Sequence, residues 1–125
     1  MAASMDELVD GLMEAMVNGS DLSPLLTEDV LMMGTDPDEY WEGRQNVAAA
    51  YAEQYRTLGQ PTFRAEGDRR VRHNGDTAWL AEHVQVTFGA FSLRLRMSGV
   101  AVREGDGQWR FSQVQAAPAQ DPVAL

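Results

Sequence analysis

The chain has 125 residues, of which 44% are hydrophobic, so residues 1–125 are expected to form one domain with a single core. Its formal net charge of −9 repels phosphate backbones and anionic membrane surfaces, which argues against nucleic acids and membranes as partners. The absence of cysteine excludes disulfides, thiolate metal sites and cysteine nucleophiles, and it fits a reducing cytoplasm.

The first half of the chain carries helix signals with one short strand between them. Ser4 and Glu7 have the spacing of a capping box, and apolar residues recur at helical intervals after them. Ser23 before a proline indicates a helical turn, and Gly59 ends a second periodic stretch. The predicted elements are a helix at 4–18, a turn around 25–26, a strand at 30–33 and a helix at 44–58.

The second half changes to the alternation of apolar and polar residues that is typical of strands. The predicted strands lie at 62–73, 77–88, 92–104 and 108–116. Asn74-Gly75 is a strong two-residue hairpin signal, residues 105–107 form a second turn, and Gly67 indicates a bulge. Helices followed by antiparallel strands predict an α+β domain in which a curved sheet wraps around the helices.

The loop at residues 34–43, GTDPDEYWEG, joins the short strand to the second helix. Together with the order of elements over residues 4–116, it resembles the SnoaL-like branch of the nuclear-transport-factor-2-like superfamily, to which ketosteroid isomerases also belong. The resemblance implies a cone-shaped half-barrel, with N-terminal helices packed on a strongly curved, mixed and mostly antiparallel β-sheet. Residues 117–125 lie beyond the matching part and are expected to form an irregular tail.

A cavity at the open end of the cone is the next expectation from this resemblance, with Trp41 of the loop as its lid. We expect the cavity to bind a small apolar or polycyclic molecule without a cofactor, and the chain to form a homodimer through the exposed face of the sheet. The alternative is a cofactor-independent isomerase, cyclase or dehydratase that uses a pocket carboxylate as general acid or base. Folds of this kind host binding modules and enzymes alike, so the residues of the cavity must decide.

The candidate lining of this cavity is mainly aromatic and methionine side chains. They suit an adaptable apolar pocket, although each of them is also typical of a filled core. Strand alternation places Gln113 and Gln115 on the same face as Trp109 and Phe111, so the two amides are expected to orient the ligand. The candidate ligand-binding residues are Met32, Trp41, Tyr51, Tyr55, Trp79, Met97, Trp109, Phe111, Gln113 and Gln115.

Two carboxylates are candidate catalytic groups, Glu82 and Asp36. Either face of the strand at 77–88 could be inside. If its apolar face is inside, Glu82 lies in a low-dielectric setting that suits general acid–base catalysis, unless Arg94 or Arg96 pairs with it across the sheet. The other interpretation of Glu82 is a salt bridge near the sheet margin. Asp36 lies in the loop beside the cavity, where an acidic run is also typical of a solvated segment before a helix.

The last strand and the loop depart from the pattern of the family. Family members often carry W-x-I-x-H-x-H at the end of the chain, where this chain has Trp109, Phe111, Gln113 and Gln115. Glutamine can orient a carbonyl or hydroxyl group but cannot take up a proton near neutral pH. The position of the ketosteroid isomerase base falls near Gly34. These departures favour a binding module slightly over an enzyme.

Metal, cofactor and targeting signals are not found in the sequence. His73 and His83 are the only histidines, and neither has metal-ligand spacing to another ligand residue, so we expect no metal and no cofactor. The N-terminus lacks the basic and apolar regions of a signal peptide, and no apolar run is long enough to span a bilayer. A cytoplasmic protein is therefore the default expectation.

Overall fold

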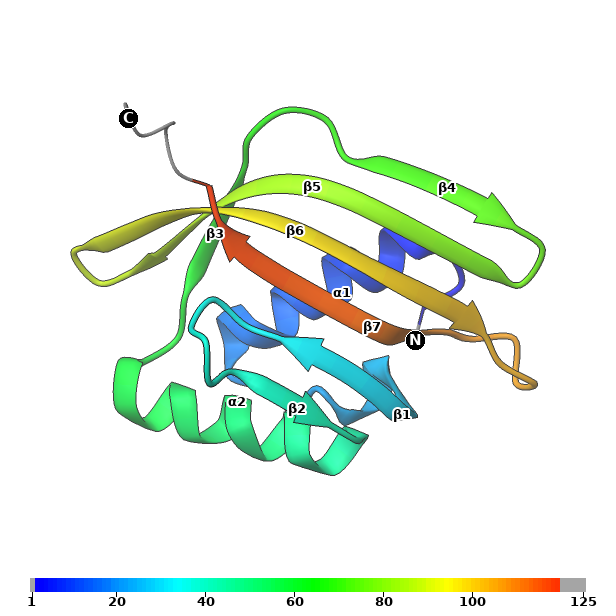
Figure 1. Ribbon diagram of the computed structural model, residues 1–125, viewed down its shortest axis with the longest axis horizontal. Coiled ribbons are helices and arrows are strands. Elements are labelled where there is room, and N and C mark those ends of the chain that lie inside the picture. The colour runs from blue at the N-terminus through cyan, green and yellow to red at the C-terminus, as the bar shows by residue number, and fades with distance from the viewer. Residues whose placement is uncertain (1, 120–125) are drawn as a thin grey trace.

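The computed structural model describes residues 2–119, which form two α-helices, a short 3-10 helix and a seven-stranded sheet (Figure 1). The elements in chain order are α1 (Met5–Asn18), the 3-10 helix η1 (Ser23–Leu25), β1 (Leu26–Met33), β2 (Tyr40–Glu42), α2 (Arg44–Leu58), β3 (Thr62–Ala65), β4 (Arg70–Asn74), β5 (Thr77–Phe88), β6 (Phe91–Arg103) and β7 (Trp109–Pro118). Within these residues, no helix is both long and apolar enough to cross a membrane.

The sheet is mixed and mostly antiparallel, which confirms the predicted fold class. Its strand order is β2-β1-β7-β6-β5-β3, and β4 pairs with β5 beyond the end of β3. Only β1 and β7 run parallel among the described pairs. Figure 1 shows β5, β6 and β7 as long, bent strands with α1 behind them and α2 beside β1 and β2. The face of the sheet that covers α1 is called the inner face below, and the opposite face is the outer face.

Helix α1 begins and ends where its local sequence predicts. The Ser4 side chain accepts a hydrogen bond from the Glu7 backbone N–H at 3.2 Å, and Glu7 Oε2 accepts one from the Ala3 N–H at 2.8 Å. The helix ends at Gly19, whose φ of 66° is the left-handed conformation that favours glycine. Its buried side chains, Met5, Leu8, Val9 and Leu12, belong to the main hydrophobic core.

Strand β5 places its apolar face inside, which settles the alternative that the sequence leaves open. Ala78, Leu80, Val84 and Val86 are buried, and Glu82 is buried among them on the same face. The side chains of Trp79, Ala81 and His83 alternate onto the outer face and are exposed. The inner face of β5 therefore contributes to the core, and its outer face is open to ligands or other chains.

Several predicted element bounds are wrong. The single strand expected at 62–73 is two strands, because the chain breaks at residues 66–69, where Gly67 has a φ of 89°. Strand β2 lies in what was expected to be loop, and β1 begins at Leu26, earlier than the expected residue 30. Strand β7 continues to Pro118, past the expected end at 116. The rest of the expected tail, residues 120–125, lies outside the described residues.

A β-bulge at Ser112 reverses the expected orientation of the last glutamines. Val100 pairs with Gln113 while Ala101 pairs with Phe111, so Ser112 is an extra residue in β7. Phe111 points inward and is buried, whereas Gln113 and Gln115 are exposed on the outer face. The expectation that both glutamines share a face with Trp109 and Phe111 is therefore wrong, because uninterrupted alternation does not hold across a bulge.

Gly99 in β6 provides a test of how closely the inner face packs. A Cβ atom at Gly99 would lie 3.0 Å from the Gln113 backbone oxygen and 3.2 Å from Cε1 of Phe111. We expect Gly99→Ala to lower the free energy of unfolding by about 1–3 kcal/mol in urea denaturation, the usual cost of overpacking. At Gly105 a Cβ would meet nothing within 4 Å, so Gly105→Ala should stay within about 0.5 kcal/mol of the parent chain. Equal stability of the two variants would contradict this packing.

Candidate functional site

A cavity of about 100 Å³ lies between α1, α2 and the inner face of the sheet. Its walls are mostly apolar side chains from the two layers, such as Leu12 of α1 and Val84, Val86 and Val114 of the sheet. Five methionines are also part of the lining: Met13, Met16, Met32, Met33 and Met97. Because methionine is unbranched and flexible, this lining can adjust its shape to a bound molecule.

Polar groups of the lining come from the β1–β2 loop and from α2. Thr35 and Glu39 belong to the loop, and Tyr51 and Gln54 lie three residues apart on α2, which places them on one side of the helix. All four side chains line the same cavity, and the negative charge of Glu39 contributes to raising the pKa of Tyr51. The cavity is thus apolar along its walls and polar where the loop meets α2.

Glu39 is held in place by its own loop. Its Oε1 accepts hydrogen bonds from the Asp36 backbone N–H at 2.8 Å and from Thr35 Oγ1 at 3.2 Å. The side chain lies against Gly34, where an added Cβ would be only 2.8 Å from the Glu39 Cβ. Glycine at position 34 therefore gives the Glu39 carboxylate room to fold back over the loop.

Tyr51 stays a protonated hydroxyl over a wide pH range. Burial raises its pKa above the ordinary value, and the charge of Glu39 and the neighbouring Tyr55 raise the pKa further. Its ring is 6.2 Å from that of Trp41 in an edge-to-face arrangement and 6.5 Å from that of Tyr55. Tyr51 is thus a fixed hydrogen-bond donor at the polar end of the cavity.

Some of the predicted lining residues lie at the cavity and others do not. Met32, Tyr51 and Met97 line it, and Trp41 and Tyr55 lie beside Tyr51. Trp41 belongs to strand β2 and contacts the ring of Tyr51, and its role as a lid stays a prediction.

The remaining predicted residues have other places in the fold. Phe111 and Trp109 are buried in the core, where the Trp109 ring lies 5.7 Å from that of His73. Trp79 is 43% exposed on the outer face, and Gln113 and Gln115 are exposed on the same face. Their expected position inside the cone is therefore wrong.

Glu82 is part of an ion cluster that joins three elements. Its Oε2 pairs with Nε of Arg69 at 3.2 Å, and Arg69 also binds Asp6 at 3.0 Å and Asp10 at 2.8 Å. Burial disfavours the charge of Arg69, but its hydrogen bonds to Asp10, Asp6 and Glu82 raise its pKa above the ordinary value. The salt-bridge interpretation of Glu82 is confirmed, with Arg69 as its partner in place of Arg94 or Arg96. Glu82 does not line the inner cavity, and a catalytic role for it stays a prediction.

Of the acidic loop, Glu39 lies at the cavity, whereas the predicted Asp36 does not, and a catalytic role for Asp36 stays a prediction. Asp36 is exposed and contributes its backbone N–H to Glu39, whereas the Glu39 side chain lines the cavity. Thr35 and Gln54 were also missed. The spacing from Thr35 or Asp36 to Glu39 is close to that of a capping box, and this signal predicts a carboxylate that folds back onto its own loop.

Metal ligation has no support in the part of the chain that is described. Residues 2–119 contain no group of three or more His, Asp or Glu side chains placed to hold a metal ion. His73 lies against Trp109, and His83 lies on the outer face of β5. The polar side chains that line the cavity, Thr35, Glu39, Tyr51 and Gln54, can form hydrogen bonds with a bound molecule.

Comparison with known proteins identifies the same fold. The SnoaL-like domain model matches residues 5–120, and no curated protein matches the chain. An NTF2-like protein of unknown function from Pseudomonas putida superposes with a TM-score of 0.81 at 16% identity, covering 94% of this chain and 85% of that chain. A candidate dehydratase of the NTF2-like family from Streptomyces avermitilis gives a TM-score of 0.77 at 22% identity, with 91% and 92% covered. A candidate ketosteroid isomerase from Parabacteroides distasonis gives 0.76 at 17% identity, with 94% and 89% covered.

Proposed function

The chain belongs to the SnoaL-like domain family, and on that premise we propose that it binds a compact apolar molecule in the cavity between its helices and sheet. The supporting observation is the cavity itself, which has apolar walls and a few polar groups at one end. This combination is typical of small-molecule sites, where apolar contacts give affinity and polar groups fix the orientation.

The size of the cavity favours a single ring over a polycyclic ligand. Sites for drug-sized molecules usually measure about 300 Å³ or more, whereas an apolar cavity of about 150 Å³ can hold benzene. The cavity here measures about 100 Å³. Rotation of the flexible Met13, Met16 and Met97 side chains can enlarge it by a modest amount. We therefore propose a ligand of one ring with a single polar group, such as a carbonyl or hydroxyl, facing Tyr51.

Filling the cavity tests the proposal. Val86→Phe places a ring in the cavity, whereas Gln85→Phe adds the same ring on the opposite face of β5. We expect at least one of cyclohexanone, phenol and toluene to raise the melting temperature of the parent chain. At a ligand concentration of 100 times its Kd, binding should add about 2.7 kcal/mol to the free energy of unfolding. Val86→Phe should abolish this shift in thermal denaturation and Gln85→Phe should retain it. No shift with any probe, or an equal shift in both variants, would reject the site.

The second candidate function is cofactor-independent proton transfer, as in isomerisation, cyclisation or dehydration. Glu39 favours it, because a carboxylate at an apolar cavity, close to the Tyr51 hydroxyl, is the pair of groups needed to move a proton on a bound ligand. Two similar structures are described as a candidate dehydratase and a candidate ketosteroid isomerase, which supports this class of reaction without identifying a substrate.

Substitution of the two loop carboxylates separates binding from catalysis. If the chain is an enzyme, Glu39→Gln should slow hydrogen–deuterium exchange next to the carbonyl of cyclohexanone by about 10²- to 10⁴-fold, measured by NMR, while thermal-shift binding persists. Asp36→Asn is the matched control, because Asp36 is exposed in the same loop and should leave the rate unchanged. If cyclohexanone exchanges no faster with the parent chain than in buffer alone, the enzyme hypothesis is rejected and only the binding function remains.

We also propose that the chain forms a homodimer through the outer face. Leu31 and Trp79 are 38% and 43% exposed there and lie in one row with Val100 and Gln113 across the paired strands. A second copy would cover this row, because exposed apolar patches often mark protein–protein contacts.

Light scattering tests the dimer. The parent chain should have the mass of two chains, and Trp79→Glu should have the mass of one, because a charge would be buried in the contact. Phe91→Glu is the control, since Phe91 is 62% exposed at the β5–β6 hairpin, away from the row. A monomeric parent chain, or dissociation by both variants, would contradict the proposed interface.

A further inference from the structure

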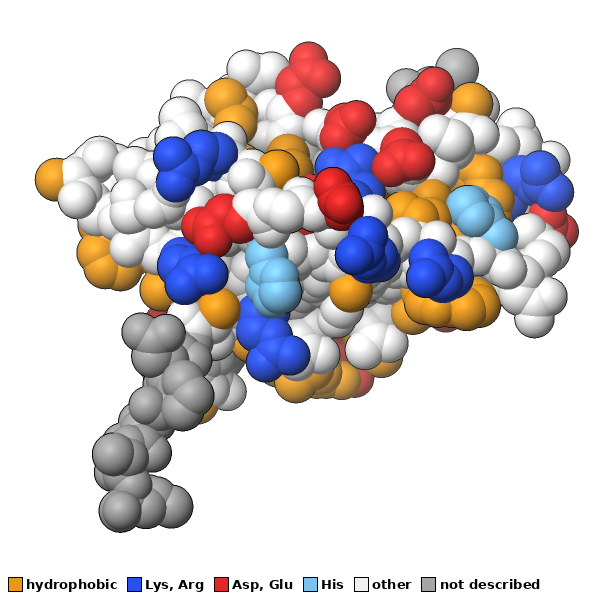
Figure 2. Space-filling model, turned by 90° about the horizontal axis from the view of Figure 1, so that it is seen from above, with side chains coloured by type: hydrophobic (Ala, Val, Ile, Leu, Met, Phe, Trp, Pro, Cys, Tyr) orange, Lys and Arg blue, Asp and Glu red, His pale blue; other side chains and the backbone are white. Residues whose placement is uncertain are grey.

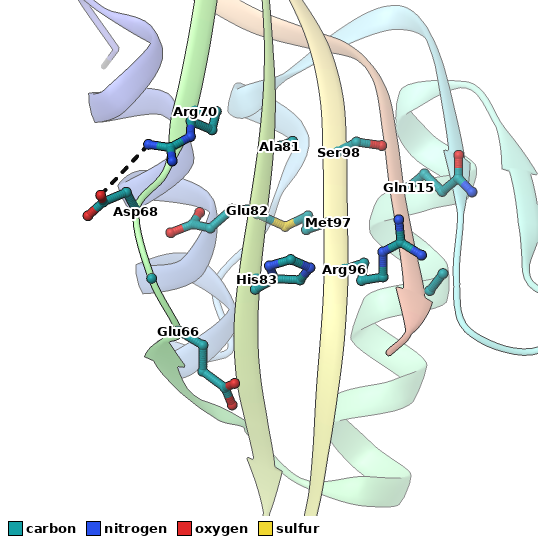
Figure 3. A pocket seen from close by; sticks show the side chains of 12 residues that line it. Glu66, Asp68, Arg70, Ala81, Glu82, His83, Arg96, Met97, Ser98 and Gln115 are labelled. Atoms are coloured by element: carbon teal, nitrogen blue, oxygen red, sulfur yellow. Dashed lines mark ion pairs between the residues drawn. The ribbon is translucent and has the colours of Figure 1, made fainter. Parts of the chain in front are cut away.

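A second hollow, of about 620 Å³, lies on the outer face of the sheet, where β5, β6 and β7 run side by side (Figure 3). Its floor includes two small side chains, Ala81 of β5 and Ala117 of β7. The strand pairing explains the depression. Ala81 lies opposite Ser98 on one side and Arg70 on the other, and Ala117 lies opposite Arg96.

Hydrogen-bond donors surround this floor. Arg96 and His83 are direct cross-strand neighbours, and Ser98 and Gln115 are direct neighbours in the next row. Figure 3 shows these four side chains coming from three adjacent strands around the hollow. A guanidinium group, an imidazole N–H, a hydroxyl and a side-chain amide thus converge on one space, and each of them can donate to an oxygen atom.

Each carboxylate of the lining already has an arginine partner. Glu66 binds Nε of Arg94 at 3.0 Å, Asp68 lies 3.7 Å from Arg70, and Glu82 binds Arg69 at 3.2 Å. Glu66 and Asp68 thus each have one arginine partner, whereas Glu82 shares Arg69 with Asp6 and Asp10.

Arg96 is the remaining arginine of the lining, and among residues 2–119 no carboxylate pairs with it. Its guanidinium group is therefore free to bind an anion in the hollow.

The arginines of the outer face contrast with the charge of the whole chain. The formal net charge is −9, yet five arginines are directed to the outer face of neighbouring strands: Arg64, Arg70, Arg72, Arg94 and Arg96. Figure 2, which views the molecule from above Figure 1, shows basic, histidine and acidic side chains interspersed along the edge of the sheet. Half of the 10 basic residues are thus directed to one face of the sheet.

We propose that the outer hollow binds an oxyanion, the carboxylate or phosphate group of a small molecule, with Arg96 as its principal partner. The planar guanidinium group binds two oxygens at once, and its charge-assisted hydrogen bonds are stronger than neutral ones. Gln115 and Ser98 donate to the oxygens from β7 and β6, and His83 donates from β5. The site differs from the inner cavity, because its hydrogen-bond donors lie on the opposite face of the same strands and the two linings share only Met97.

An NMR titration of the full chain tests this site. Sodium phosphate and, separately, sodium acetate are added at an ionic strength held constant with sodium chloride. We expect saturable shifts of the amide signals around Arg96, Ser98 and Gln115 with at least one of the two anions. Tighter binding of phosphate would assign the ligand group as a phosphate, and tighter binding of acetate would assign it as a carboxylate.

Two variants with the same change of charge give the decisive comparison. Arg96→Gln should weaken binding about tenfold, the usual effect of losing a charge-assisted hydrogen bond. Arg72→Gln should leave the affinity within about twofold, because Arg72 lies on the same face beside Trp79 and outside the hollow. Arg96→Lys keeps the charge but loses the planar guanidinium group, so its affinity for the anion should lie between those of the other two variants.

Three results would overturn the proposal. Shifts that do not saturate with either anion would show that the hollow has no specific site. If Arg96→Gln and Arg72→Gln weaken anion binding equally, the binding depends on the general charge of the surface and not on a specific site. A change in mass of Arg96→Gln in light scattering, with unchanged anion binding, would assign Arg96 to the contact between two copies of the chain.

Discussion

Strand β7 changes the face that it presents at Ser112, and both proposed sites depend on this change. Before the bulge, Phe111 points inward and lies against Gly99, where it fills the core. Beyond the bulge, Val114 points inward to the cavity wall and Gln115 points outward to the hollow. Without the extra residue, the glutamines would enter the apolar cavity and Val114 would be exposed, which costs unpaired amides as well as hydrophobic burial. One inserted residue thus sets the polarity of both faces.

Local signals are sufficient to predict the two α-helices and the turns after β4 and β6, but not the pairing of β1 with β2. The bounds of α1 depend on Ser4 and Gly19, which are neighbours of the helix in sequence, and β5 has the predicted bounds because a tight turn fixes its start. The breaks depend on distant contacts. Arg69 binds Asp6, 63 residues away, at the point where the expected strand at 62–73 divides. The bulge likewise depends on how β7 pairs with β6, and the sequence of β7 alone does not predict it.

The candidate site is predictable to the extent that periodicity decides which side chains point inward. Met32, Tyr51 and Met97 follow this rule and line the cavity. Glu39 does not, because an acidic run before a helix is usually solvated and only the fold of the loop over Gly34 distinguishes it from Asp36. Glu82 shows the opposite case. Its burial is predictable from the strand, but its partner comes from a loop whose position the strand pattern does not contain.

The net charge of −9 and a binding site for an oxyanion are compatible because the two act over different distances. At physiological salt the field of a surface charge decays over about 8 Å, so a small ligand in the hollow interacts mainly with Arg96 and its immediate neighbours. A nucleic acid carries a charge on every phosphate and extends well beyond the hollow, where the acidic remainder of the surface repels it. The charge of the chain therefore argues against long polyanions, whereas the arrangement of its arginines admits a single oxyanion. The composition of a protein limits its extended partners more strictly than its small ligands.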